Sequence, residues 1–139
     1  MTQEDKELLL KDLCARLPYH PQIRIYNDSW EGCRIGEFNN TLGFHHVEAF
    51  LCDRIEITPY LRPMSSMTEE EKKEIRRYFR NCIDELHKTS DVEKQFFLGF
   101  CQDAVSLDYL NSHYFDYRGL IGRGLALEAP EGMYNEKEK

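Results

Sequence analysis

Residues 22–28 read QIRIYND, and the alternation within this stretch decides the fold. Ile23 and Ile25 alternate with the longer polar side chains of Arg24 and Tyr26, which is the period-two pattern of a strand with one buried face. The Asn-Asp pair that follows is a turn signal. We therefore expect a strand here that lays its isoleucines on a core and exposes its other face.

Similar short runs continue to about residue 61, separated by turn-forming residues. Gly32, Gly36 and the pair Asn39-Asn40 mark the breaks, and Asp53 allows a last turn before another alternating run. Region 22–61 therefore predicts a small antiparallel meander of three or four strands. A sheet of this size either packs one face against helices or twists into a partly open barrel.

The stretch Phe44–Cys52 fits two interpretations. Val47, Ala49 and Leu51 alternate as they would in a strand of the meander, which is the interpretation we use for the fold. The same stretch also fits one short helix, so both alternatives stay open.

Helical spacing predicts the remaining elements. A helix is expected from Thr2 to Leu17, capped by Thr2 and stopped by Pro18. Residues 59–67, PYLRPMSSM, are too rich in proline and serine for regular structure and predict a linker. Thr68 and Glu71 form a capping box that opens a helical part over 68–114, with two or three helices and a second capping box at Ser90.

The expected fold is thus α+β, with an N-terminal helix, a meander and C-terminal helices in one domain over residues 1–134. Residues 135–139 are charged and predict a frayed tail. Ile75, Phe79 and Ile83 lie on the apolar face of the helix after Thr68, so truncating Phe79 or Ile83 to alanine should cost about 2–5 kcal/mol.

Charge and composition disfavour several classes of function. The chain has 139 residues and a net charge of −7, and a protein that depends on phosphate contacts usually shows a basic face, so nucleic-acid binding is disfavoured. The five cysteines form no C-x-x-C pair, which argues against a disulfide framework and a zinc ribbon. With no signal-peptide pattern and no apolar run of about 20 residues, we expect a cytoplasmic protein without cofactors.

The densest polar cluster lies near the C-terminus. His113, Asp116 and Arg118 could serve a small enzyme as acid, base and anion anchor. Alternatively Tyr114, Phe115 and Tyr117 anchor this segment on the core, with Asp116 capping a turn and pairing with Arg118. A third interpretation makes Tyr114, Phe115, Tyr117 and Arg118 a surface for a protein partner.

Three further patterns have weaker functional interpretations. RGLIGRGL (118–125) lacks the strand and the glycine order of a phosphate loop, so its glycines predict turns with positive φ. His45 and His46 point to opposite sides if they lie in a strand, but a helix would place Glu48 and Cys52 beside His45 as metal ligands. Aromatic residues of the meander could stack single-stranded nucleic acid, although core packing is the better interpretation. The aromatic residues are Trp30, Phe38, Phe44 and Phe50.

Three stretches carry a resemblance: KDLCARLPY (11–19), PYLRPMSSMTEEEKKE (59–74) and LNSHYFDYRGLIGRGLALEAPEGMY (110–134). They resemble segments of uncharacterised small proteins of gut bacteria and their phages and mobile elements. The resemblance implies a compact intracellular protein from a phage or mobile element, and it brings no activity, cofactor or catalytic residue. The function expected is a non-enzymatic accessory factor that binds a protein partner.

Overall fold

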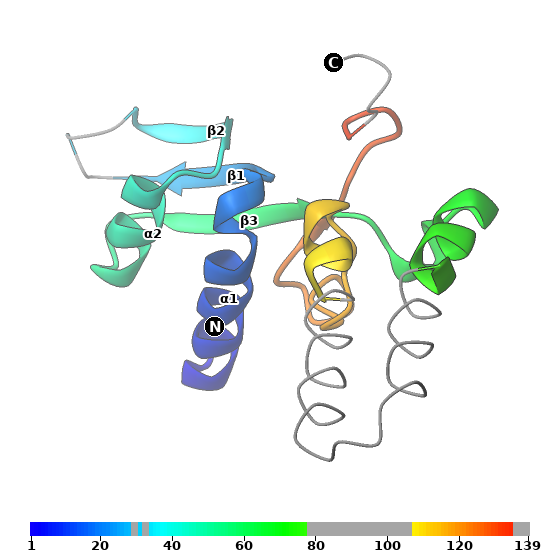
Figure 1. Cartoon of the computed structure of the whole chain (residues 1–139). Coiled ribbons are helices and arrows are strands. Elements are labelled where there is room, and N and C mark those ends of the chain that lie inside the picture. The colour runs from blue at the N-terminus through cyan, green and yellow to red at the C-terminus, as the bar shows by residue number, and fades with distance from the viewer. Residues whose placement is uncertain (29–30, 32–33, 78–106, 135–139) are drawn as a thin grey trace.

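A mixed sheet of four strands, in the order β2-β1-β3-β4, forms the centre of the computed structural model, which describes residues 1–28, 31, 34–77 and 107–134 (Figure 1). β1 (Gln22–Asn27) lies between β2 (Gly36–Thr41) and β3 (Glu56–Leu61) and is antiparallel to both. The short β4 (Leu127–Glu128) runs parallel to the end of β3. The α+β class is confirmed, and the sheet does not close into a barrel.

The connectivity differs from the predicted meander in two respects. β1, the first strand in sequence, is the central one of the antiparallel three, because α2 (Phe44–Leu51) separates β2 from β3 and lets β3 pair on the other side of β1. The three strands within residues 22–61 are antiparallel, as expected, but their order is not that of a meander, and the fourth strand is parallel and comes from the C-terminal segment.

The expected alternation in β1 is confirmed. Ile23 and Ile25 are fully buried opposite Pro59 and Ile57 of β3. Tyr26, by contrast, is exposed, so the sheet has one apolar inner face and one polar outer face.

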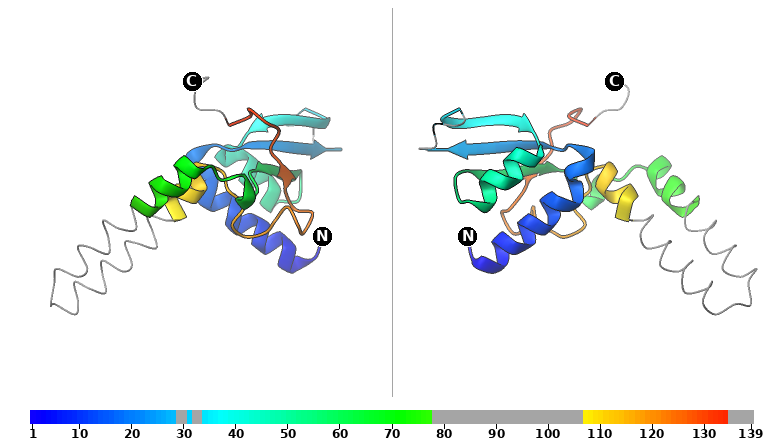
Figure 2. Two further views of the ribbon diagram at one scale, coloured as in Figure 1. Left: turned by 90° about the vertical axis from the view of Figure 1, so that its right-hand side faces the viewer. Right: turned by 60° about the vertical axis from the view of Figure 1, so that its left-hand side comes forward.

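Two helices cover the inner face. α1 (Gln3–Arg16) begins where Thr2 Oγ1 accepts a hydrogen bond from Asp5 N at 3.1 Å, and it packs the fully buried Leu9 and Leu13 into the core. The short 3-10 helix η1 (Leu17–Tyr19) follows it. α1 and α2 lie on the same side of the sheet in both views of Figure 2. The helix expected from Thr2 to Leu17 is therefore confirmed to within a residue at each end.

The strand interpretation of Phe44–Cys52 is wrong, and the helix alternative is confirmed. The buried residues of α2 are His46, Val47, Ala49 and Phe50, which is helical spacing, whereas Leu51 is exposed. Gly43 N donates to His46 Nδ1 at 2.9 Å and closes the first turn. The turn expected at Asn39-Asn40 is also wrong, because both lie in β2, where an exposed sheet edge accepts polar side chains.

The predicted linker begins later than expected. Residues 59–61 belong to β3, and residues 64–66 form a second 3-10 helix, η2 (Met64–Ser66). Pro59 fits a strand because it lies opposite Ile23 in a pair whose backbone groups point away from each other, so no bond to β1 is lost.

The C-terminal helices are described in part, over residues 69–77 and 107–112. The capping box is confirmed: Glu71 N donates to Thr68 Oγ1 at 3.1 Å and Thr68 N to Glu71 Oε1 at 3.0 Å. Phe79, Ile83, the capping box at Ser90 and the tail 135–139 lie outside the described residues. In the part of the chain that the structure describes, no helix is long and apolar enough to cross a membrane.

Candidate functional site

The outer face of the sheet is built from alternate residues of three strands. The registers of β1 with β2 and with β3 place these residues in rungs that run across the sheet. Since side chains of one rung lie directly opposite one another, they interact across the strands. The rungs are Thr41–Gln22, Asn39–Arg24–Thr58 and Glu37–Tyr26–Glu56.

The last of these rungs places an exposed aromatic ring between two carboxylates. Tyr26 is 48% exposed, with Glu37 opposite it on β2 and Glu56 opposite it on β3. Arg24 Nε pairs with Glu37 Oε1 at 3.1 Å. Glu56 has no ion pair with any described residue, so this end of the face keeps an acidic excess.

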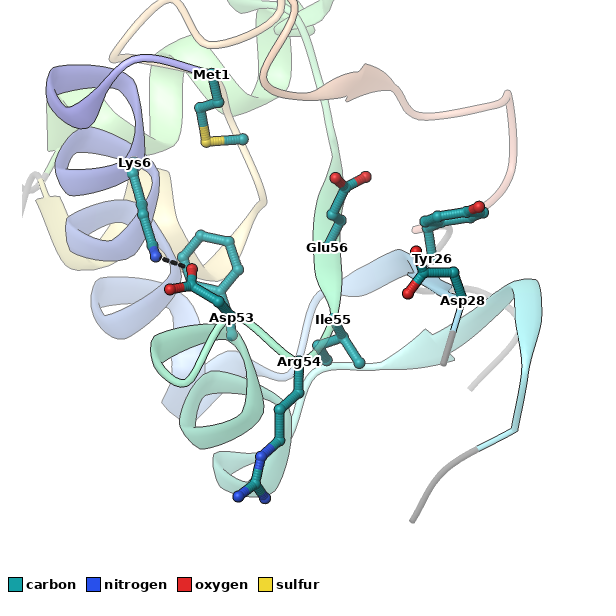
Figure 3. Close-up of a pocket in the computed structure, with 9 residues that line it drawn as sticks. Met1, Lys6, Tyr26, Asp28, Asp53, Arg54, Ile55 and Glu56 are labelled. Atoms are coloured by element: carbon teal, nitrogen blue, oxygen red, sulfur yellow. Dashed lines mark hydrogen bonds and ion pairs between the residues drawn. The ribbon is translucent and has the colours of Figure 1, made fainter. Parts of the chain in front are cut away.

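Two hollows flank Tyr26 and Glu56, which line both of them. The smaller, of about 260 Å³, lies on the outer face and includes Glu37. The larger, of about 430 Å³, extends to the start of α1 (Figure 3). On its far side Lys6 forms an ion pair with Asp53. The end of the sheet that carries Tyr26 and Glu56 is therefore hollowed and mostly polar.

Hydrogen bonds hold the side chains at the other end of the face. Gln22 Nε2 donates to Thr41 Oγ1 at 2.9 Å, and the Tyr60 hydroxyl reaches over β1 to Asn39 Oδ1 at 2.9 Å. The Tyr134 hydroxyl accepts from Gln22 N at 2.8 Å and donates to Tyr60 O at 2.7 Å. This end of the face is thus tied together from within the chain.

The free edge of β2 carries unused backbone groups. Leu42 N donates to Pro21 O, which fixes the alternation of bonds along β1 and β2: residues 38 and 40 bond to β1, and residues 37, 39 and 41 point outward. Thr41 N is taken by Asn40 Oδ1 at 2.8 Å. The outward N–H and C=O groups of Glu37 and Asn39 have no partner among the described residues.

The predicted catalytic candidates have separate partners. His113 Nδ1 lies 3.0 Å from Tyr109 O, and its ring stacks on that of Tyr109. The buried Asp116 accepts from Leu120 N at 2.8 Å and Ile121 N at 3.0 Å, so its carboxylate closes a turn. Neither hollow beside Tyr26 is lined by His113, Asp116 or Arg118.

Arg118 belongs to a buried ionic cluster and does not pair with Asp116. Its Nε donates to Asp12 Oδ1 at 3.1 Å, and Asp12 Oδ2 accepts from Arg16 Nε at 2.8 Å. Arg16 Nη2 donates to Phe115 O at 2.5 Å, whereas Arg16 Nη1 has no partner among the described residues. Asp12 and Arg16 are fully buried, so this cluster fastens α1 to the C-terminal segment.

The aromatic residues proposed as a binding surface make contacts within the chain. Phe115 is fully buried, with the Arg62 guanidinium 4.2 Å from its ring centroid. The Tyr114 hydroxyl donates to Tyr19 O at 2.6 Å, and the Tyr117 hydroxyl donates to Asn111 Oδ1 at 2.8 Å. These contacts have the geometry of anchors on the core.

The weaker patterns also have structural explanations. Gly119 and Gly124 have φ values of 74° and 75°, so both occupy the turn conformation expected of them. The helix in α2 leaves His45 exposed and buries His46, whose pKa is lowered by burial and by the neighbouring His45. No three potential metal ligands gather within the described residues. Of the four aromatic residues singled out in region 22–61, Phe50 is buried and Phe38 is half-buried, as core packing predicts, but Phe44 is exposed, so core packing is wrong for it; Trp30 lies outside the described residues.

Comparison with known proteins gives no match to a family model, to a curated protein or to a solved structure.

Sequence reasoning did not identify the rung at Tyr26. The alternation in β1 indicated that Tyr26 would face outward, but nothing local to Glu37 or Glu56 sets the register that brings them beside it. The available signal was an aromatic residue on the polar side of an amphipathic strand.

Proposed function

We propose that this chain is a non-enzymatic accessory factor that binds a protein partner through the outer face of its sheet around Tyr26. The observation that carries the proposal is the exposed tyrosine held between two carboxylates on a face that no described helix covers. Tyrosine is among the residues that contribute most to protein interfaces, because its ring buries a large area and loses few rotamers.

The arrangement of the face supports binding without large rearrangement. The cross-strand bonds between Gln22 and Thr41 and between Tyr60 and Asn39 order its side chains before a partner arrives. Ordered side chains lose less conformational entropy on association, so more of the contact energy remains as affinity.

Charge favours a basic partner. The rung at Tyr26 is acidic, and the whole chain carries a net charge of −7. A basic partner would meet this acidic face faster, because opposite charges attract over a distance. The same acidic face would repel acidic proteins and nucleic acids. Both ends of the chain resemble proteins of gut bacteria and their phages and mobile elements, and an origin in a phage or mobile element would suit a host protein as the partner.

A retention experiment with two matched variants tests the proposal. Tyr26→Ser removes the exposed ring, and Leu51→Ser removes a side chain of similar exposure, 53% against 48%, from α2 on the opposite side of the sheet. We expect proteins retained from a lysate of the native host by the wild-type chain to be retained by Leu51→Ser and lost with Tyr26→Ser. Equal retention by Tyr26→Ser, or no retained protein at all, would contradict the proposal.

A further inference from the structure

The free edge of β2 offers a partner a defined way to bind. β2 spans six residues, contains no proline and no lysine, and pairs with β1 without a bulge. Natural sheets usually protect an exposed edge with a proline, a lysine or a bulge, because unpaired backbone groups are a template for another strand. The opposite edge, β4, is only two residues long, so within the described residues β2 is the longer open edge.

We infer that a partner of the proposed factor adds an extended segment as a further strand along β2, and that this segment alternates basic and apolar side chains. The inference rests on the proposed function and adds the mode of binding and the chemistry of the bound segment. Strand addition takes its affinity from main-chain hydrogen bonds and its specificity from alternate side chains.

The backbone of β2 sets where the segment pairs. Glu37 and Asn39 each present an outward N–H and an outward C=O, whereas the bond from Thr41 N to Asn40 Oδ1 closes the next position. The added strand therefore bonds to the Gly36 half of β2. This is also the end of the sheet that carries Tyr26 and the two hollows.

The side chains of β2 set the chemistry of the segment. Partner residues opposite Glu37 and Asn39 lie on the outer face, where the Glu37 side chain is 58% exposed and the uncompensated Glu56 lies farther along the same rung. A basic side chain there gains attraction mainly from Glu37, because Glu56 lies three strand spacings, roughly 14 Å, from the added strand and is largely screened at that distance. The partner residue between them faces the inner side beside the half-buried Phe38, which favours an apolar side chain.

The alternation of bonds along β2 allows a variant that removes an outward N–H and leaves the pairing with β1 unchanged. Asn39→Pro removes an N–H that points away from β1, so the pairing of β1 with β2 stays intact, and proline is tolerated on edge strands in this position. Asn39→Ala is the matched control, since it loses the same side-chain bond to Tyr60 but keeps the N–H.

The probe is a short synthetic peptide of alternating arginine and valine with blocked ends, titrated at low salt by fluorescence anisotropy. We expect Asn39→Ala to bind it more weakly than the wild-type chain only by the loss of the ordering bond to Tyr60, and Asn39→Pro to bind it about tenfold more weakly than Asn39→Ala. A glutamate–valine peptide should bind much more weakly to the wild-type chain and to both Asn39 variants. The same arginine–valine peptide, N-methylated on the amides that pair with β2, should also lose affinity for the wild-type chain, which tests these bonds without altering the protein.

The outcomes separate this inference from the proposed function. Equal binding by Asn39→Pro and Asn39→Ala together with loss of binding in Tyr26→Ser would overturn strand addition and leave binding at the outer face standing. If Asn39→Pro, Asn39→Ala and Tyr26→Ser all bound the peptide as the wild-type chain does, the peptide would bind elsewhere and the inference would be overturned, while the retention experiment would decide the proposed function. Absence of binding by the wild-type chain would overturn the inference, and the retention experiment would then decide the proposed function.

Discussion

The hydroxyl of Tyr134 takes the place of one hydrogen-bonded backbone pair between β1 and β3. The pairing of β1 with β3 ends at Ile23 and Pro59, and beyond it Tyr134 accepts from Gln22 N and donates to Tyr60 O. Burial raises the pKa of Tyr134 well above its usual value, so the hydroxyl keeps its proton and can donate. One oxygen atom thus satisfies two backbone groups of neighbouring strands.

Tyr134→Phe should therefore destabilise the fold measurably. The ring remains to stack on Tyr114, but Gln22 N and Tyr60 O lose their partner, and we expect the free energy of unfolding to fall by about 1–3 kcal/mol in urea titrations. Tyr60→Phe is the control, since it removes only an exposed bond to Asn39 and should change stability by less than about 0.5 kcal/mol. Equal losses in the two variants would show that the bridge contributes nothing of its own.

Elements whose signals are local were predictable. The cap at Thr2, the capping box of Thr68 and Glu71 and the alternation in β1 depend on residues within a few positions of one another, and each is confirmed. α2 was misread because Val47, Ala49 and Leu51 happen to alternate. What decides its structure is packing: His46 and Phe50 are buried and Leu51 is not, and only the tertiary fold sets that choice.

The start of the helix at residues 69–77 is held to the sheet by an ion pair. Arg62, the residue after β3, donates from Nη1 and Nη2 to the two oxygens of Glu71 at 2.8 and 2.7 Å. Burial alone raises the pKa of Glu71, but hydrogen bonds from Arg62 and Thr68 outweigh it and lower the pKa from 4.5 to about 2. The folded chain therefore keeps this carboxylate ionised at a pH where the unfolded chain takes up a proton.

This difference predicts a pH dependence with a definite sign. Because the folded pKa is the lower one, the stabilisation by Glu71 is complete above about pH 4.5 and is lost as pH falls towards 2. Glu71→Gln should lower the free energy of unfolding by about 1.5–3 kcal/mol at pH 7, and its difference from the wild-type chain should shrink over that window. Glu69→Gln, which touches only an exposed pair with Lys72, should differ little at any pH. A difference for Glu71→Gln that stays constant from pH 7 to pH 2 would contradict this account.

The candidate site depends on contacts across the whole chain, which is why the sequence did not reveal it. Tyr26, Glu37 and Glu56 come from three strands, and their proximity follows from the registers of two strand pairs. The polar cluster at 113–118 attracted attention as a linear run, yet its members are distributed among different partners. Arg118 reaches Asp12, which lies 106 positions earlier in the chain.

The same long-range pairing gives the strongest expected effect of a single substitution. Asp12 is fully buried and its two oxygens accept from Arg16 and Arg118, so one carboxylate compensates two guanidinium groups. Asp12→Asn keeps the shape but leaves the buried guanidinium of Arg16 without a counter-charge, and breaking a buried ion pair in this way costs about 3–5 kcal/mol. The expected result is a large fall in the urea midpoint, with helix α1 and the C-terminal segment losing protection from hydrogen exchange together.

Asp5→Asn is the control, because the Asp5 carboxylate only meets the exposed Arg123 at 3.5 Å and the change in the free energy of unfolding should stay within about 0.5 kcal/mol. A loss below about 1 kcal/mol for Asp12→Asn would contradict this account of the buried cluster.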